Sequence, residues 1–171
     1  MNIQITRINQ EQQELFLNLY NLYLYDLSEF TGDEPKDNGN FDPTNTYLYL
    51  ERQELHPYFI KTNEKVIGFI LVCSPPFVIE EVDYTIQELF LLKKYRGRNI
   101  AARAVELVIS KLDGTVRVEQ LKINKSAVRF WKKFFEHHNI GFTEMEESIE
   151  IEGLEGQHTI VSQEFVITKI K

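Results

Sequence analysis

Arg96-Gly97-Arg98-Asn99-Ile100-Ala101 is the stretch of this chain that decides its fold. It follows an apolar run, Ile86 to Leu92, that is typical of a buried strand. Apolar residues at helical spacing come next: Ile100, Ala104, Leu107, Val108 and Leu112. The first amides of a helix lack intrahelical partners and lie at the positive end of its dipole. The sequence therefore predicts a strand, a tight turn and a helix that together can bind phosphate, with Arg96 and Arg98 adding positive charge.

The composition predicts one soluble domain over residues 1–171. Lys and Arg number 19 and Asp and Glu number 26, so the net charge is −7, which argues against a general nucleic-acid or anionic-membrane surface. The only cysteine, Cys73, excludes an intrachain disulfide, and its apolar surroundings favour a buried strand residue over a nucleophile. We see no signal peptide and no apolar run that could span a bilayer, and we expect a cytoplasmic protein.

Periodicity and turn residues predict the remaining elements. The expected strands are Ile3–Ile8, His56–Thr62, Lys65–Cys73, Tyr84–Leu92, Thr115–Ile123, Glu144–Glu152 and Thr159–Thr168. The expected helices are Glu11–Phe30, Asn99–Leu112 and Ser126–His138, and Asp113-Gly114 reads as the C-cap of the second. Asn63-Glu64 predicts a hairpin turn, and Thr31–Asn45 predicts a long loop that is either a lid or a surface excursion. Tyr47–Leu55 fits a short helix or a strand.

Asn124 lies at the end of a predicted strand and just before a predicted helix that carries Ala127, Phe130 and Trp131. One interpretation is a plain helix N-cap, because asparagine is a favoured cap and Ser126 lies nearby. The other is contact with a ligand at the strand end. Both can hold together.

These two features, one helix and one strand apart, resemble the GNAT superfamily of acyl-CoA-dependent N-acyltransferases. Arg96, Asn99 and Ala101 match the family's Q/R-x-x-G-x-G/A turn. Asn124, Ala127, Phe130 and Trp131 match its N-x-x-A-x-x-F-Y segment. The resemblance implies an α+β (mixed α/β) fold: a central mixed, mostly antiparallel sheet of six to seven strands, flanked by helices and splayed between strands 84–92 and 115–123.

The resemblance also implies a site for acetyl-CoA as co-substrate, with no metal. The diphosphate would lie on the amides of Arg98 to Ala101 beside Arg96, and the pantetheine arm would bond to the backbone of Leu89 and Leu91. The Leu91 amide would polarise the thioester carbonyl. The implied coenzyme-binding residues are Leu89, Leu91, Arg96, Gly97, Arg98, Asn99, Ile100, Ala101, Asn124, Ala127 and Trp131.

Two residues depart from the family pattern. Asn99 replaces a glycine, but asparagine tolerates left-handed backbone better than other non-glycine residues. Trp131 replaces the tyrosine proposed as general acid, and an indole N–H cannot serve as a proton donor in turnover. Another group or water would then protonate the leaving thiolate, or no strong acid is needed.

Glu88 is the candidate general base, because it is an ionisable group in an apolar run three residues before Leu91. The alternative is a strand glutamate that points to solvent or pairs with a lysine. Burial would raise its pKa toward neutrality. His56, His137, His138 and His158 show no ligand spacing, and the pair at 137 and 138 fits a helix C-terminus.

The acceptor is expected between the first helix, the Thr31–Asn45 loop and the last hairpin. Tyr20, Tyr23 and Tyr25 are candidates to line it, although a position in the core or in an interface stripe is expected for at least two of them. Loop carboxylates could steer a cation, which suggests an amine, a polyamine or an aminoglycoside-like acceptor.

The predicted function is therefore N-acetyl transfer from acetyl-CoA to a small-molecule or peptide amine, by direct attack and without a covalent enzyme intermediate. The leading alternative is a non-catalytic acyl-CoA-binding regulatory module, suggested by Trp131 and Asn99; a plain scaffold for protein partners is a third. No nucleic-acid or membrane partner is expected, and a homodimer is left open.

Overall fold

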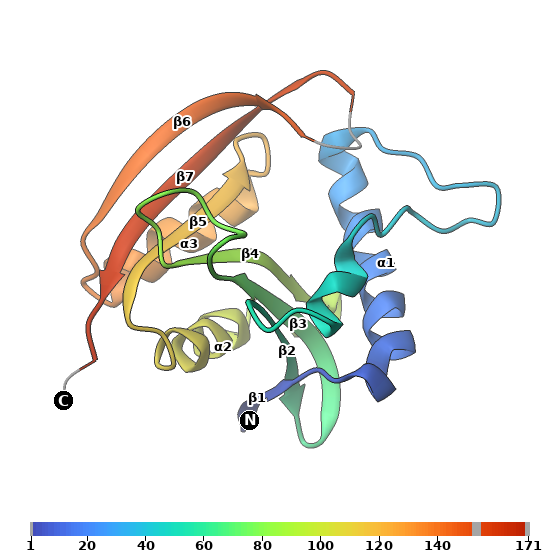
Figure 1. The fold of residues 1–171 in the computed structure, drawn as a ribbon, viewed down its shortest axis with the longest axis horizontal. Helices are drawn as coiled ribbons and strands as arrows, with labels where there is room; N and C mark the ends of the chain where they lie inside the picture. The colour runs from blue at the N-terminus through green and yellow to red at the C-terminus, as the bar shows by residue number, and fades with distance from the viewer. Residues whose placement is uncertain (1, 152–154, 170–171) are drawn as a thin grey trace.

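Seven strands form one sheet in the order β1-β2-β3-β4-β5-β7-β6 (Figure 1). The structure is a computed structural model that describes residues 2–151 and 155–169. The strands are β1 (Ile3–Arg7), β2 (Leu55–Thr62), β3 (Lys65–Cys73), β4 (Tyr84–Leu91), β5 (Gly114–Leu121), β6 (Phe142–Glu150) and β7 (Gln157–Ile167). The α-helices are α1 (Gln13–Thr31), α2 (Ile100–Ile109) and α3 (Lys125–His137), and the 3₁₀ turns are η1 (Gln10–Gln12), η2 (Thr46–Leu50) and η3 (Lys93–Tyr95).

Most predicted elements are confirmed with small shifts at their ends. The β2–β3 hairpin turns at Asn63 and Glu64, both with positive φ, and the ambiguous segment after residue 45 is the 3₁₀ turn η2. The predicted turn after β6 lies partly at residues 152–154, which are outside the described residues. In the described part of the chain, no helix is both long and apolar enough to cross a membrane.

The prediction that Gly114 caps α2 is wrong. The helix ends at Ile109 with Ser110 as its C-cap, and i to i−3 bonds from Lys111 and Leu112 tighten the turn that follows. Gly114 instead begins β5 with φ 130°, and a Cβ there would lie 2.2 Å from Asp83 Oδ2. The glycine is needed because the Asp83 carboxylate occupies the space that a Cβ would take. There it accepts a hydrogen bond from the Thr115 amide at 2.8 Å.

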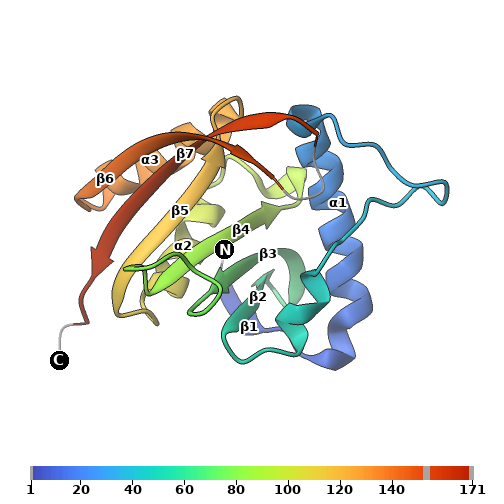
Figure 2. The same cartoon turned by 45° about the horizontal axis from the view of Figure 1, so that its top comes forward.

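The sheet splits between β4 and β5, as expected. These two strands form the sheet's one parallel ladder among the described residues, and it pairs only Tyr84 with Val116, Thr85 with Arg117 and Ile86 with Val118. Beyond Ile86 the two strands diverge (Figure 2). Elsewhere, every described pair of neighbouring strands is antiparallel.

A β-bulge lies in β4 at the point where this ladder stops. Val72 of β3 pairs with Ile86 and Leu71 pairs with Glu88, so Gln87 is an extra residue. An inserted residue bends a strand and reverses which face the following side chains point to. Ile86 packs in the core under α2 and α3, whereas Phe90, two residues beyond Glu88, packs in the core under α1. The bulge therefore turns Glu88 toward α1.

Hydrophobic cores cover both faces of the sheet. The larger core packs α2 and α3 against one face and contains Val105, Val108 and Phe135, all fully buried. The smaller core packs α1 and η2 against the other face and is rich in aromatic rings, among them Phe16 and Phe69. The split between β4 and β5 therefore opens toward α2 and α3 on one face of the sheet and toward α1 on the other.

The first testable prediction concerns Gly68 of β3, where the sheet is tightest beside β4. A Cβ on Gly68 would lie 2.0 Å from the Phe90 carbonyl oxygen, a backbone atom that cannot move aside. We expect Gly68→Ala to lower the free energy of unfolding by ~1–3 kcal/mol in urea titrations. The matched control is Gly141→Ala, because nothing lies within 4 Å of a Cβ there. Equal stability of the two variants would contradict the packing described for β3 and β4.

Candidate functional site

A groove of about 1250 Å³ opens where β4 and β5 part. Its walls come from the second half of α1, the end of β4, the turn before α2, the end of β5, α3 and the β6–β7 hairpin. All the residues predicted to bind coenzyme or to act in catalysis line it except Arg98, which is exposed beside it. The structure thus brings together residues that lie from position 88 to position 131 in the sequence.

The turn before α2 presents helix amides to this groove. Gly97 has φ 72° and Asn99 has φ 59°, so the expected left-handed backbone at Asn99 is confirmed. Arg103 donates its amide to the Asn99 carbonyl at 3.2 Å, which begins the α2 hydrogen-bond ladder. The amides of residues 100–102 precede that bond and have no intrahelical acceptor. Together with the helix dipole they form a positive end that suits an anion.

Arg96 links this turn to α1. Its Nε donates to the Leu91 carbonyl oxygen at 2.8 Å, and its Nη2 is bonded to the Asp26 carboxylate. Lys93 lies 3.4 Å from the other oxygen of Asp26. The guanidinium therefore holds the end of β4 against α1, and its predicted contact with a diphosphate stays a prediction.

The backbone of Leu89 and Leu91 faces the gap between β4 and β5. The Leu92 amide donates to the Ile67 carbonyl of β3 at 2.9 Å, whereas the Leu91 carbonyl accepts from Arg96 on the other side. Backbone groups of successive residues in an antiparallel strand alternate between its two edges. The polar groups of Leu89 and Leu91 consequently point away from β3, into the split, while their side chains pack in the larger core.

Glu88 lies on the α1 side of the split and accepts a hydrogen bond from the Tyr23 hydroxyl. Burial raises the pKa of Glu88 from its ordinary 4.5 to about 7, and the bond from Tyr23, which favours the carboxylate, opposes this rise. Burial and the neighbouring Glu88 charge also raise the pKa of Tyr23 well above 10. The alternative of a solvent-facing or lysine-paired Glu88 is therefore wrong: this carboxyl is placed to exchange a proton near neutral pH.

At the other wall, Asn124 is the N-cap of α3. Its Oδ1 accepts from the Ala127 amide at 3.1 Å and from the Ser126 hydroxyl at 2.8 Å, so the capping interpretation is confirmed. Asn124 also lines the groove, and its contact with a ligand stays a prediction. Trp131 is 5% exposed and stacks on Phe135 with 5.9 Å between ring centroids. Its indole is a rigid wall of the groove.

The α1 end of the groove, where the acceptor is predicted to bind, differs in part from expectation. Tyr23 and the β6–β7 hairpin line it, but of the predicted Thr31–Asn45 loop only Thr31, which is the last residue of α1, does so. The Phe41 amide donates to Asn21 Oδ1 at 2.8 Å, and the buried Phe41 ring fixes the loop to a different side of α1. Of the three candidate tyrosines only Tyr23 lines the groove, because Tyr20 is buried in the smaller core and Tyr25 is 62% exposed elsewhere on α1.

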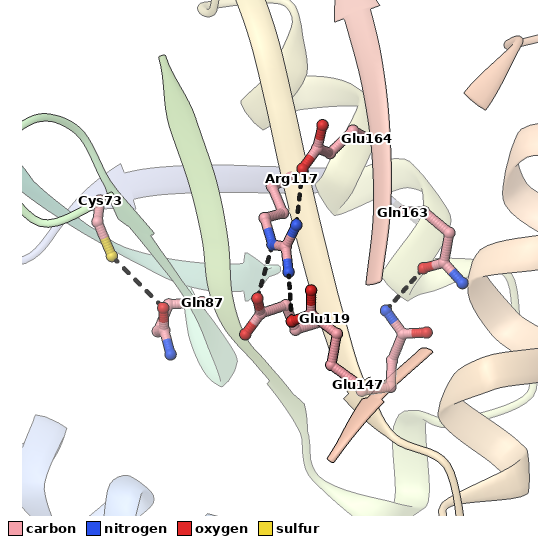
Figure 3. A network of polar contacts seen from close by, with 8 residues as sticks. Cys73, Gln87, Arg117, Glu119, Glu147, Gln163 and Glu164 are labelled. Atoms are coloured by element: carbon pink, nitrogen blue, oxygen red, sulfur yellow. Dashed lines mark hydrogen bonds and ion pairs between the residues drawn. The ribbon is translucent and has the colours of Figure 1, made fainter. Parts of the chain in front are cut away.

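A buried guanidinium gathers three carboxylates beside this end. Arg117 of β5 donates to Glu119 and to Glu164, each at 2.6 Å, and lies 3.7 Å from Glu147 of β6 (Figure 3). The same view shows Gln87 turned toward Cys73, whose sulfur lies 3.8 Å from the amide oxygen. These charges hold β5, β6 and β7 together on the face of the sheet opposite α3.

Several of these contacts were not predicted from the sequence. They are the Tyr23–Glu88 bond, the Asp26–Arg96 pair and the Arg117 network. One signal existed for α1: Tyr23, Asp26, Leu27 and Phe30 follow i, i+3, i+4 and i+7 spacing and therefore share a face. Across the ranges 2–151 and 155–169, His, Cys, Asp and Glu form no group of three suited to a metal ion.

Comparison with known proteins gives a consistent result. A family model described as "Acetyltransferase (GNAT) family" matches residues 16–136. This match spans nearly all of α1, strands β2 to β5 with the bulge, the turn before α2 and nearly all of α3. No curated protein sequence matches the chain.

Solved structures share the fold over nearly the full chain. An acetyltransferase from Thermus thermophilus is 14% identical with a TM-score of 0.62, covering 95% of this chain and 96% of its own. The ribosomal-protein-S18-alanine N-acetyltransferase of Escherichia coli is 10% identical with a TM-score of 0.64, covering 99% and 97%. Spermidine N-acetyltransferase from Vibrio cholerae, solved with CoA and spermine, is 12% identical with a TM-score of 0.64, covering 96% and 94%. At these identities the likeness shows the fold alone.

The site predicts how Tyr23 sets the pKa of Glu88. The hydroxyl stabilises the charged carboxylate, so Tyr23→Phe removes a contact that lowers the pKa, and we expect the value to rise above about 7. A carboxyl ¹³C NMR titration of Glu88 measures it. Tyr25→Phe is the control, since Tyr25 lies on the same helix but is exposed. A Glu88 pKa that is unchanged or lower in Tyr23→Phe would show that this contact does not hold in solution.

Proposed function

Because the chain belongs to the acetyltransferase (GNAT) family, and is thus an acyltransferase, we propose that it moves an acetyl group from acetyl-CoA to a primary amine. The amine attacks the thioester directly, with no covalent enzyme intermediate, and residues 1–171 act as one domain. The observation that carries the proposal is the position of Glu88, a half-buried carboxyl with a pKa of about 7 beside the split in the sheet.

The chemistry of the groove supports coenzyme A as its ligand. The amides of Ile100 and Ala101, with the left-handed turn through Gly97, Arg98 and Asn99, are suited to the diphosphate, and Arg96 lies alongside. The inward-facing backbone of Leu89 and Leu91 can bond to the amides of the pantetheine arm as a further strand would. Asn124, Ala127 and Trp131 form the opposite wall. Acetyl-CoA itself supplies the activated acyl thioester.

Glu88 acts as the general base. An amine is a cation at pH 7 and must lose a proton before it can attack a carbonyl carbon. The Glu88 carboxylate takes this proton directly or through one water. A base whose pKa lies near 7 is ionised in a substantial fraction of molecules at neutral pH yet still holds the proton it receives.

Backbone and leaving group complete the reaction. The Leu91 amide faces the split and donates to the oxygen of the thioester carbonyl as negative charge develops there. Trp131 cannot donate a proton, so the departing thiolate, which is already a fair leaving group, takes one from water or leaves as the anion. Burial raises the pKa of Cys73 to about 11, so the only thiol is not a nucleophile, which favours direct attack.

A non-catalytic acyl-CoA-binding module remains the second candidate, because Trp131 occupies the position of the expected acid. The two functions differ in one measurement. An enzyme incubated with acetyl-CoA and a panel of amines releases free thiol, whereas a binding module raises its melting temperature with acetyl-CoA and releases none.

Glu88→Gln tests the base. The amide keeps the shape of the side chain but cannot accept the proton, so we expect kcat to fall by roughly 10²- to 10⁴-fold with unchanged CoA affinity. In the wild type, kcat/KM should rise with pH through about 7, because only the carboxylate acts, and this limb should vanish in the variant. Glu14→Gln, at an exposed position of α1 outside the groove, is the control. Equal turnover of Glu88→Gln and wild type at every pH would remove Glu88 from the mechanism.

Ala101→Glu tests the anion site at the start of α2. A carboxylate in the first turn suits the helix dipole, so the melting temperature of the free protein should stay constant or rise. The same charge repels a diphosphate, and we expect the CoA-induced rise in melting temperature to disappear. Gln13→Glu places the same charge at the first residue of α1, outside the groove, and should keep the full CoA response. A normal CoA response in Ala101→Glu would mean that the diphosphate binds elsewhere.

A further inference from the structure

We propose that the acceptor is a primary amine carried on an apolar body, with a single positive charge, rather than a polyamine. The inference rests on the proposed function and concerns the part of the same groove on the α1 side of Glu88. It assigns specificity to Leu27 and Phe30 of α1 and to the facing side chains of β5, β6 and β7.

Strand register shows which side chains share the face of Glu88. Thr85 pairs with Arg117 and Ile86 with Val118, and Ile86 and Val118 both belong to the core under α2 and α3. Arg117 therefore points to the opposite face, and residues 119 and 121 follow it by alternation. Leu121 pairs with Ile160, which pairs in turn with Glu147. The α1 side of the sheet therefore carries Leu121 and Ile160. It also carries Ile149, because Ile149 lies two residues after Glu147 on β6 and so points the same way.

These residues make the acceptor end of the groove apolar. Its lining contains Leu27 and Phe30 from α1, Leu121 from β5, Ile149 and Ile151 from β6 and the segment after it, and Ile160 from β7. The last part of β6 and the first part of β7 run toward the C-terminal end of α1 (Figures 1 and 2). An alkyl or aryl group that enters between them buries apolar surface against both walls.

Two of the carboxylates around this end, Asp26 and Glu119, are already paired with cations. Asp26 is bonded to Arg96 and lies 3.4 Å from Lys93, and Glu119 accepts from Arg117 at 2.6 Å. Glu29 is exposed on the rim, where solvent screens its charge. Of the described carboxylates inside this end, Glu88 alone has no cation within ion-pair distance. The acceptor end of the groove therefore offers a single carboxylate, Glu88, to pair with one ammonium group.

The second charge of a diamine is thus the discriminating feature. Once the first amine reaches Glu88, the remaining chain extends between Leu27, Phe30 and Ile160. An ammonium group there would lose water without gaining a partner, which is unfavourable, whereas a methyl group at the same place is stabilised.

The test compares hexylamine with hexane-1,6-diamine, which differ only in the terminal group. Thiol release from acetyl-CoA by the wild-type protein gives kcat/KM for each, and we expect hexylamine to be preferred by about tenfold or more, the equivalent of one buried uncompensated polar group. A third arm uses a tetrapeptide with N-terminal leucine and one with N-terminal lysine. Preference for the leucine peptide would assign the apolar body to a peptide, and preference for hexylamine over both peptides would assign it to a small molecule; either result supports the proposal.

Leu27→Glu provides the matched variant. It introduces an unpaired carboxylate at the apolar wall, and we expect it to raise kcat/KM for the diamine relative to hexylamine. Leu22→Glu, at an exposed position of the same helix outside the groove, should keep the wild-type ratio. Wild-type preference for the diamine, or a ratio that Leu27→Glu does not change, overturns the inference while thiol release leaves the proposed function intact. No thiol release from any amine overturns the proposed function, and the inference with it.

Discussion

One extra residue in β4 sets the geometry of the site. At Gln87 the strand bulges, and just before it the ladder with β5 ends at Ile86 and Val118. A regular strand would point Glu88 into the same core as Ile86, where an ionisable group is costly. The bulge instead turns Glu88 toward Tyr23 and aims the backbone of Leu91 into the opened gap. The orientation of the Glu88 carboxyl, the orientation of the Leu91 amide and the gap between β4 and β5 therefore all depend on this one bulge.

Positive and negative groups lie in different parts of the groove. At the start of α2, where we propose that the coenzyme binds, helix amides lie in a basic turn of a protein whose net charge is −7. Arg96 pairs with Asp26 and bonds to the Leu91 carbonyl, which joins α1 to β4, and Arg117 pairs with carboxylates of β5, β6 and β7 and joins those strands. Glu88 is left without a cation, and its pKa is raised because the hydrogen bond from Tyr23 only partly opposes the effect of burial. In our proposal, the substrate ammonium supplies the missing charge.

The sequence predicted what depends on local spacing and missed what depends on distant contacts. Strand alternation, helix periodicity and the turn at Asn99 were predicted correctly because each is encoded within a few residues. Gly114 was misread because a glycine after a helix suggests a C-cap, whereas the Asp83 carboxylate that requires it is distant in sequence. The face of the sheet to which Glu88 points depends on the bulge at Gln87. The hydrogen bond between Glu88 and Tyr23 joins residues that are 65 positions apart in the sequence. No local pattern contains that information.

The central claim is that the gap beside the bulge holds coenzyme A with its thiol end next to Glu88. A crystal structure of the wild-type protein with bound CoA tests it most directly. The account predicts the diphosphate on the amides at the start of α2, the pantetheine arm bonded to Leu89 and Leu91, and the sulfur on the Glu88 side of the split. Coenzyme bound outside the split, or β4 and β5 paired along their full length with the gap closed, would contradict it.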